Sequence, residues 1–294
     1  MNNFKEGCKV IFQWHFWSAL VICAGIIAYL LFIESYINWF DTIVFCLTFA
    51  TFCTLSNLWF LFIKSIINKK KHRTSRFILE KDRELLYRRL VIILFIITII
   101  GCLFQIIRIS YSLIIPIVIA FISAIIHPFS KYSIIGNLLV LVIFVYLPSN
   151  TLSTINLGGF DWRYFLVALP IAFLTTAILN TTKLEGINPK KNIEKNPSKI
   201  LYNKIIIILY ILETIIPFFL IIFLTYIRML PSWIYLTYIT LPIALVNCIL
   251  LFHCYLVNTK DPYSLRNRSI LLLYLFGTYY IFSFLISYLI IHYS

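Results

Sequence analysis

The stretch NTTKLEGINPKKNIEKNPSK, residues 180–199, is the longest polar interruption in the second half of this chain. Apolar runs at 162–180 and 204–226 flank it, and each is long enough to cross a hydrocarbon layer about 30 Å thick as a helix. The stretch therefore predicts a loop between two membrane-spanning helices. Its place at the end of a span makes it a candidate reaction site, although Glu185 and Glu194 are its only carboxylates.

The composition places the whole chain among integral membrane proteins. Of its 294 residues, 61% are hydrophobic and 12% are charged, and the mean hydropathy is +0.94. A water-soluble domain cannot bury that much apolar surface. Because the apolar runs are continuous and do not alternate with polar residues, they predict α-helices and not a β-barrel.

Apolar runs of spanning length recur along the chain. The sequence predicts one all-α transmembrane domain, residues 1–294, with nine transmembrane helices. Two long loops, about 68–87 and 181–203, lie on one side, and the first is expected to carry a short helix that lies over the bundle or runs into the next span. The expected spans are 10–33, 40–67, 88–107, 109–127, 133–151, 162–180, 204–226, 230–257 and 268–292.

The basic residues predict the orientation of these spans. Almost all of the 25 lysines and arginines fall in the N-terminal segment and in every second loop after it. By the positive-inside rule these parts are cytoplasmic, so the C-terminus lies outside. We assign the net charge of +14 to topology and to contact with anionic phospholipid, and not to nucleic acid. A multi-pass protein of the plasma membrane is expected.

The cysteines and short motifs predict no familiar reaction centre. Seven cysteines contain no Cys-x-x-Cys pair, and most lie inside apolar spans, where cysteine packs as a small hydrophobic residue. The sequence shows no nucleophile triad, phosphate-cradling glycine loop or zinc pattern.

Three short segments resemble those of a known family. Residues 127–132, HPFSKY, followed by Gly136 and Asn137, are similar to the turn between the fourth and fifth helices of the UbiA superfamily of intramembrane prenyltransferases. Residues 170–186, PIAFLTTAILNTTKLEG, resemble the end of that family's sixth helix, and residues 73–80, RTSRFILE, resemble the segment after its second. The resemblance implies a UbiA-like bundle with a cavity open to the cytoplasmic side. It also implies transfer of an isoprenyl group from a diphosphate to a membrane-accessible acceptor.

The chain departs from this family at both Asp-rich motifs, which hold magnesium against the diphosphate. Mg²⁺ takes oxygen ligands from carboxylates and phosphates, and it neutralises the leaving group as it departs. Here no Asp or Glu lies between Asp41 and Glu80, and only Asn57 keeps the expected residue type there. At the sixth helix Glu185 is the one carboxylate within residues 180–188. The resemblance implies magnesium, but the usual pair of magnesium sites is missing.

Eight residues are candidates for binding a diphosphate or another anionic head group. Each has an alternative role: topology charges for the basic residues, interhelical hydrogen bonds for the two asparagines at span ends, and a solvated acid paired with a lysine for the glutamate. Lys183 has a further role open to it, as a point charge that replaces a metal–aspartate unit at the phosphate. The candidates are Asn57, Arg73, Arg76, Lys131, Asn180, Lys183, Glu185 and Asn188.

Glu213 lies inside the expected span 204–226. A charge there is costly and usually faces the bundle interior or a cavity. The alternative for this residue is a neutral, hydrogen-bonded structural carboxyl group.

Two functions of different classes remain open. In the first, the protein is a divergent prenyltransferase in which basic side chains replace some of the metal. In the second, it is a catalytically inactive relative that binds a lipid or isoprenoid, or scaffolds a membrane enzyme complex. The missing aspartates favour the second and the resemblance favours the first. Both imply membrane lipids and an isoprenoid diphosphate or other anionic lipid as partners.

Epitope tags at the two ends test the orientation. With nine spans and a cytoplasmic N-terminus, a tag after Ser294 is expected to be cleaved by protease added to intact cells. A tag before Met1 should stay protected until the membrane is permeabilised. Protection of the C-terminal tag in intact cells would contradict the nine-span topology.

Overall fold

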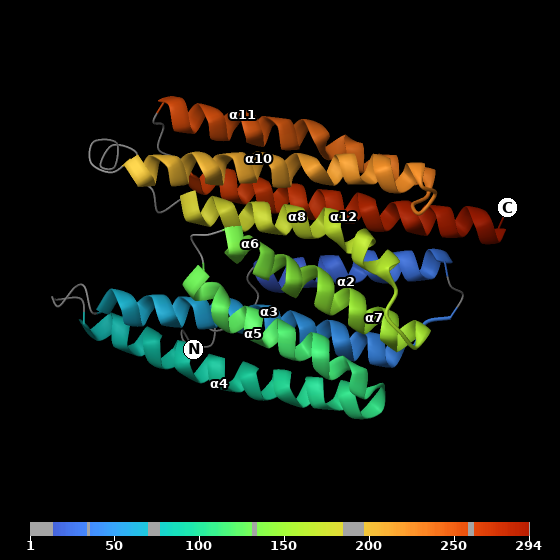
Figure 1. Ribbon diagram of the computed structural model, residues 1–294, viewed down its shortest axis with the longest axis horizontal. Helices are drawn as coiled ribbons and strands as arrows, with labels where there is room; N and C mark the ends of the chain where they lie inside the picture. Colours follow the sequence, from blue (N-terminus) through green and yellow to red (C-terminus); the bar gives the residue numbers. More distant parts are fainter. Residues whose placement is uncertain are drawn as a thin grey trace. The chain divides into compact units, whose positions relative to one another are not determined.

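A computed structural model describes residues 14–33, 36–69, 77–130, 134–184, 197–257 and 262–293, with the backbone alone near several helix ends. Every regular element within these ranges is helical (Figure 1). The α-helices are α2 (Trp14–Ile33), α3 (Trp39–Lys69), α4 (Phe77–Arg108), α5 (Ile114–Ser130), α6 (Ile134–Leu141), α7 (Leu147–Leu157), α8 (Trp162–Leu184), α10 (Pro197–Tyr226), α11 (Leu241–Val257) and α12 (Pro262–Tyr293). Between them lie the 3₁₀ segments η1 (Tyr111–Leu113) and η3 (Ser232–Thr240) and the π-helical segment η2 (Val142–Tyr146).

Eight stretches of the described chain are long and apolar enough to cross a membrane, so the protein is an integral membrane protein. The expected span 109–127 is a shorter apolar helix, Tyr111–His127. At 1.5 Å per residue it reaches about 26 Å, slightly less than the hydrocarbon layer. The eight stretches are Trp14–Ile33, Trp39–Trp59, Arg88–Arg108, Ile135–Leu157, Trp162–Thr181, Lys204–Tyr226, Ser232–Phe252 and Leu265–His292.

Both long loops are shorter than predicted because helices extend into them. The short helix expected within 68–87 is the first part of α4, which begins at Phe77 and runs into the span. In the second loop, α8 continues to Leu184 and α10 begins at Pro197. Proline is favoured at the first position of a helix, because its missing N–H would have no partner there anyway.

The exposed face of α4 is apolar, as expected for a helix in contact with lipid. In the membrane-spanning part of α4, within Arg88–Arg108, only 17% is buried inside the structure. Ile100 and Ile107 expose 62% and 73% of their surface. Such a continuous apolar face is unfavourable in water and is the normal surface of a helix against lipid tails.

The chain divides into two compact units. Unit 1 comprises residues 1–23 and 36–162, and unit 2 comprises residues 24–35 and 163–294. The first part of α2 therefore belongs to unit 1 and its second part to unit 2. The two units are described separately below.

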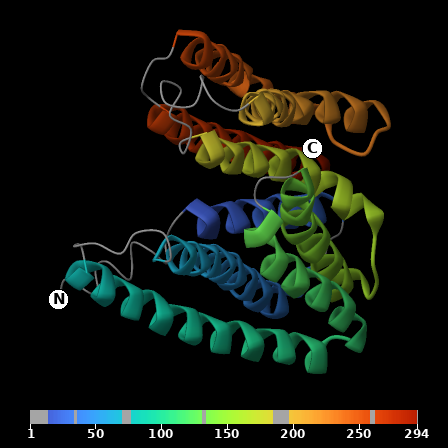
Figure 2. The same cartoon turned by 60° about the vertical axis from the view of Figure 1, so that its left-hand side comes forward.

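In unit 1, α3 and α4 lie side by side (Figure 1 and Figure 2). Gly101 of α4 faces Thr48 of α3, and a Cβ atom at Gly101 would lie 2.7 Å from Thr48 Cγ2. Further along the pair, Leu55 and Leu58 pack against Leu94. Close approach of two helices at a small residue is a common way to gain van der Waals contact in a membrane.

A polar cluster closes one end of unit 1. Arg108 Nε lies 2.7 Å from Asp41 Oδ1, and the Arg108 guanidinium also lies 5.0 Å from the centre of the Phe40 ring. Asn38 Nδ2 donates to Asp41 Oδ2 at 2.7 Å. Asn156 Oδ1 accepts from the Asn38 backbone N–H at 3.0 Å. The carboxylate at the start of α3 is thus paired with the cation at the end of α4, so the charge is not left unpaired at the membrane edge.

The π-helical segment η2 interrupts the fifth apolar span just before a proline. Pro148 has no N–H and would collide with the carbonyl one turn back in a regular helix. The Leu147 N–H instead donates to the Val142 carbonyl, five residues earlier. This wider turn adds one residue and rotates the following helix α7 by about 100° relative to a regular helix.

In unit 2, aromatic side chains fill the space between α2, α8 and α12. Tyr280 of α12 donates its hydroxyl hydrogen to the Val167 carbonyl of α8 at 2.9 Å. Tyr29 of α2 stacks edge-on against Tyr164 and Phe284, with ring centres 5.5 and 5.7 Å apart. These rings bury apolar area while the tyrosine hydroxyl of α12 finds a backbone partner.

The substitution Gly101→Ala tests the close contact of α3 with α4. The added methyl group overlaps Thr48, and overpacking of this kind typically costs about 1–3 kcal/mol. We expect a lower midpoint of thermal unfolding in detergent for Gly101→Ala, and partial recovery when Thr48→Ala is added. Gly159→Ala is the matched control, because a Cβ atom there meets nothing within 4 Å. Equal midpoints for the two single variants would contradict the packing.

Candidate functional site

A buried hydrogen bond joins α8 to α10 in unit 2. Asn180 is fully buried and Glu213 is 6% exposed. Asn180 Nδ2 donates to Glu213 Oε2 at 2.6 Å. Glu213 lies nine residues beyond Lys204, about 13 Å into the span, where a carboxyl group without donors is costly. The bond therefore provides the partner that a glutamate at this depth needs.

The same bond fixes the orientation of the Asn180 amide. The nitrogen of Asn180 faces Glu213 Oε2 and donates to it, an arrangement that suits a carboxylate because a carboxylate only accepts hydrogen bonds. Asn180 Oδ1 then points elsewhere, and this buried atom has no hydrogen-bond partner. An acceptor oxygen held in this way is able to receive a hydrogen bond from water or a ligand.

Other polar side chains from α10, α11 and α12 lie in the interior of unit 2. The Tyr210 hydroxyl lies 2.7 Å from Ser269 Oγ, which itself donates to the Leu265 carbonyl at 2.9 Å. Tyr210 is therefore the donor to Ser269. On α11, Asn247 is fully buried, and neither of its amide atoms has a hydrogen-bond partner.

A hydrophobic cluster shows that these residues lie at a similar depth. Ala177 of α8, Tyr210 of α10, Leu251 of α11 and Leu265 of α12 belong to it. Cys248 packs against this cluster, and it follows Asn247 directly in the chain. We call Asn180, Glu213, Tyr210, Ser269 and Asn247 the polar layer of unit 2.

The structure describes only some of the predicted site residues. Asn57 lies on α3, is half-buried, and belongs to unit 1. Lys183 lies in the last turn of α8, where the backbone alone is described. The remaining five lie outside the described residues, and their roles stay predictions: Arg73, Arg76, Lys131, Glu185 and Asn188.

Asn180 makes the interhelical hydrogen bond that is one of its two expected roles. Glu213 likewise is a buried, hydrogen-bonded carboxyl group. Sequence reasoning singled out both residues but did not pair them. It missed Asn247, Tyr210 and Ser269, although an asparagine within the apolar run ALVNCILL is the kind of signal that marks a polar position inside a membrane.

The described residues do not fit a pair of magnesium ions. They contain no group of three or more His, Cys, Asp or Glu side chains able to hold a metal. Glu213 Oε2 already accepts from Asn180, so this carboxyl group is engaged within the protein. Mg²⁺ requires six oxygen ligands in near-octahedral geometry, so we derive no reaction step through a metal.

Comparison with known proteins places the chain in no group. No protein-family model matches it, and neither the curated proteins nor the solved structures contain a significant match.

A double-mutant cycle tests the hydrogen bond between Asn180 and Glu213. Asn180→Leu leaves a buried carboxyl group with one donor fewer, which should cost about 1–3 kcal/mol of unfolding free energy. Glu213→Gln keeps an acceptor oxygen for the amide and should cost less. When Asn180→Leu and Glu213→Leu are combined, the loss should be smaller than the sum of the two single losses. Strict additivity in detergent unfolding would show that the two side chains do not interact.

Proposed function

We propose that this chain is a membrane protein that binds an isoprenoid diphosphate or another anionic lipid and has lost prenyl-transfer chemistry. The observation that carries the proposal is the bond from Asn180 to Glu213 at 2.6 Å. The resemblance to prenyltransferases puts Asn180 beside the metal and diphosphate. In the structure Asn180 is fully buried, and its hydrogen bond joins α8 to α10. This bond stabilises the helix pair and occupies the amide nitrogen of Asn180.

The sequence from the last turn of α8 to the first turns of α10 supplies the attraction for an anionic head group. Residues 183–204 contain six lysines and two glutamates. Lysines near a membrane surface each contribute about 1 kcal/mol to binding of anionic lipid. They act on a phosphate as point charges without a metal ion, which fits a chain that lacks both Asp-rich motifs.

The proposal includes a UbiA-like bundle of nine spans with a cavity open to the cytoplasm. Tyr111–His127 is the ninth span in this scheme, tolerated at its reduced length because a bilayer thins locally around a short helix at modest cost. The N-terminus is cytoplasmic and the C-terminus lies outside the plasma membrane, as the distribution of basic residues predicts. The basic stretch after α8 then faces the anionic inner leaflet.

Prenyl transfer is the second candidate function. It is favoured by the unpartnered oxygen of Asn180, which offers one ligand atom at the position that the resemblance assigns to the substrate. In that case Lys183 and its neighbours replace the metal charge at the departing diphosphate, and an isoprenyl group moves to a membrane-accessible acceptor.

Binding and turnover measurements on the full-length protein in nanodiscs separate the two functions. We expect saturable binding of farnesyl diphosphate that EDTA does not change. A triple variant in which Lys183, Lys190 and Lys191 are all changed to alanine should bind farnesyl diphosphate about a hundredfold more weakly. Each lost charge removes about 1 kcal/mol of binding free energy. Arg268→Ala, an exposed cation of α12, is the control and should change affinity little.

The same preparation is then supplied with magnesium and a panel of acceptors. The proposal expects no prenylated product above the protein-free background. Magnesium-dependent product that falls in Glu185→Gln or Lys183→Ala would replace our proposal with the second candidate. Absence of both binding and turnover would contradict both functions.

A further inference from the structure

Arg108 lies at a membrane edge of unit 1. It ends the spanning stretch Arg88–Arg108, which has 21 residues and is about 30 Å long as a helix, the thickness of the hydrocarbon layer. Tyr36 and Trp39 lie at the start of α3 and Tyr111 lies three residues after Arg108, and all three rings are exposed. Because tryptophan and tyrosine gather at the membrane–water interface, the Arg108 guanidinium lies at the depth of lipid head groups.

Two kinds of contact hold this guanidinium in place. Its Nε lies 2.7 Å from Asp41 Oδ1. Its central carbon lies 5.0 Å from the centre of the Phe40 ring and 5.7 Å from that of Phe104, and the two rings contact each other edge-on. A cation over an aromatic ring is attracted by the ring face. A side chain held in this way loses less conformational freedom when it binds a ligand.

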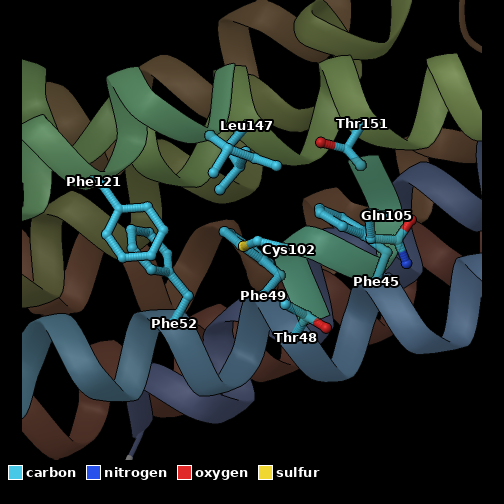
Figure 3. A pocket seen from close by; sticks show the side chains of 10 residues that line it. Phe45, Thr48, Phe49, Phe52, Cys102, Gln105, Phe121, Leu147 and Thr151 are labelled. Atoms are coloured by element: carbon cyan, nitrogen blue, oxygen red, sulfur yellow. The ribbon is translucent and has the colours of Figure 1, made fainter. Parts of the chain in front are cut away.

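Asp41 is itself fixed by its neighbours. Its side chain is only 4% exposed, and Asn38 Nδ2 donates to its Oδ2 at 2.7 Å. The Asp41 backbone carbonyl accepts from Gln105 Nε2 at 3.3 Å, and Gln105 and Phe45 border an apolar pocket of unit 1 (Figure 3). The carboxyl group is thus a buried anchor on one side of Arg108.

The other side of the guanidinium is open. The Arg108 side chain is 52% exposed, although its carboxylate partner is buried. Within the described residues, no group accepts a hydrogen bond from Nη1 or Nη2. These two nitrogens carry four N–H groups, and a guanidinium donates two parallel hydrogen bonds to the oxygens of one phosphate. Arg108 is therefore able to bind a phosphate while it stays paired with Asp41.

The ion pair also sets the kind of phosphate that fits. Asp41 compensates the charge of Arg108, so the pair attracts an anionic lipid only weakly from a distance. Charge-assisted hydrogen bonds from the guanidinium act at short range and remain available. The site therefore recognises the phosphate group itself and does not depend on a net negative charge of the lipid.

We propose that Arg108 binds the phosphate of a phospholipid through Nη1 and Nη2, with Asp41 and Phe40 holding the guanidinium. The acyl chains of this lipid lie along the exposed apolar face of α4, which includes Ile107. The orientation predicted from the basic residues puts this edge at the outer leaflet. The site is then separate from the lysine-rich stretch 183–204 and does not rest on the function proposed for it.

Lipid-dependent thermal unfolding of the full-length protein in maltoside detergent tests the site. Phosphatidylcholine is the main probe, because it carries a phosphate without net charge. We expect it to raise the unfolding midpoint more than a glycosyl diacylglycerol with the same acyl chains and no phosphate. Arg108→Lys keeps the charge but loses the parallel N–H groups. It should need about tenfold more phosphatidylcholine for the same rise, equal to about 1.4 kcal/mol.

Two further variants serve as control and second test. Arg228 is also exposed, but within the described residues it has no ion pair and no ring contact. Arg228→Lys should therefore keep the wild-type response. Phe40→Leu removes the ring and leaves the pair of Arg108 and Asp41, and it should weaken the response about threefold. This variant tests the site even if Arg108→Lys does not fold.

Four results would overturn the proposal. The first is an equal response of wild type, Arg108→Lys and Phe40→Leu to phosphatidylcholine. The second is an equal loss in Arg108→Lys and Arg228→Lys, because any exposed arginine would then serve. The third is an equal rise with the phosphate-free lipid. The fourth is an equal rise with inorganic phosphate alone, which would assign the site to the free ion and not to a lipid.

Discussion

A hydrocarbon layer offers no water to pair with polar groups, and this constraint shapes every part of the described chain. Backbone groups are satisfied within helices, and the few polar side chains inside must find partners on neighbouring helices. Asp41 is paired with Arg108 at one end of unit 1. Glu213 is paired with Asn180 inside unit 2. Both acids are buried, and each pairs with a side chain on a neighbouring helix, which helps to hold the two helices together.

The polar atoms left without partners are therefore informative. Gln105 Oε1, Thr151 Oγ1, Asn180 Oδ1 and both amide atoms of Asn247 are buried and unpartnered. Most buried polar groups in folded proteins are hydrogen-bonded to protein or to ordered water. In unit 1 two such atoms belong to Gln105 and Thr151, which are neighbours of one apolar pocket. In unit 2 they belong to the polar layer, which contains Asn180. This residue is a candidate for binding the diphosphate by resemblance to prenyltransferases, and its side chain is buried in the structure.

The positions of the long apolar helices were predictable because a spanning helix needs only length and hydrophobicity. Segments with altered hydrogen bonding were not, since the π-helical turn before Pro148 depends on how one proline is accommodated. In the candidate site, Glu213 could be singled out as a charge within a span. Its pairing with Asn180, 33 residues away, depends on how α8 and α10 face each other, which apolar composition does not specify. The roles of the predicted loop residues, Lys131 and Glu185 among them, remain predictions.

A structure in nanodiscs with farnesyl diphosphate bound would show directly whether Asn180 remains paired with Glu213 when the ligand is present. We predict that Asn180 Nδ2 stays within hydrogen-bond distance of Glu213 Oε2. The diphosphate should contact lysines of the stretch 183–204 without a pair of metal ions. A bound state in which Asn180 has left Glu213, and in which its side chain contacts the diphosphate or a magnesium ion, would contradict a structural role for Asn180.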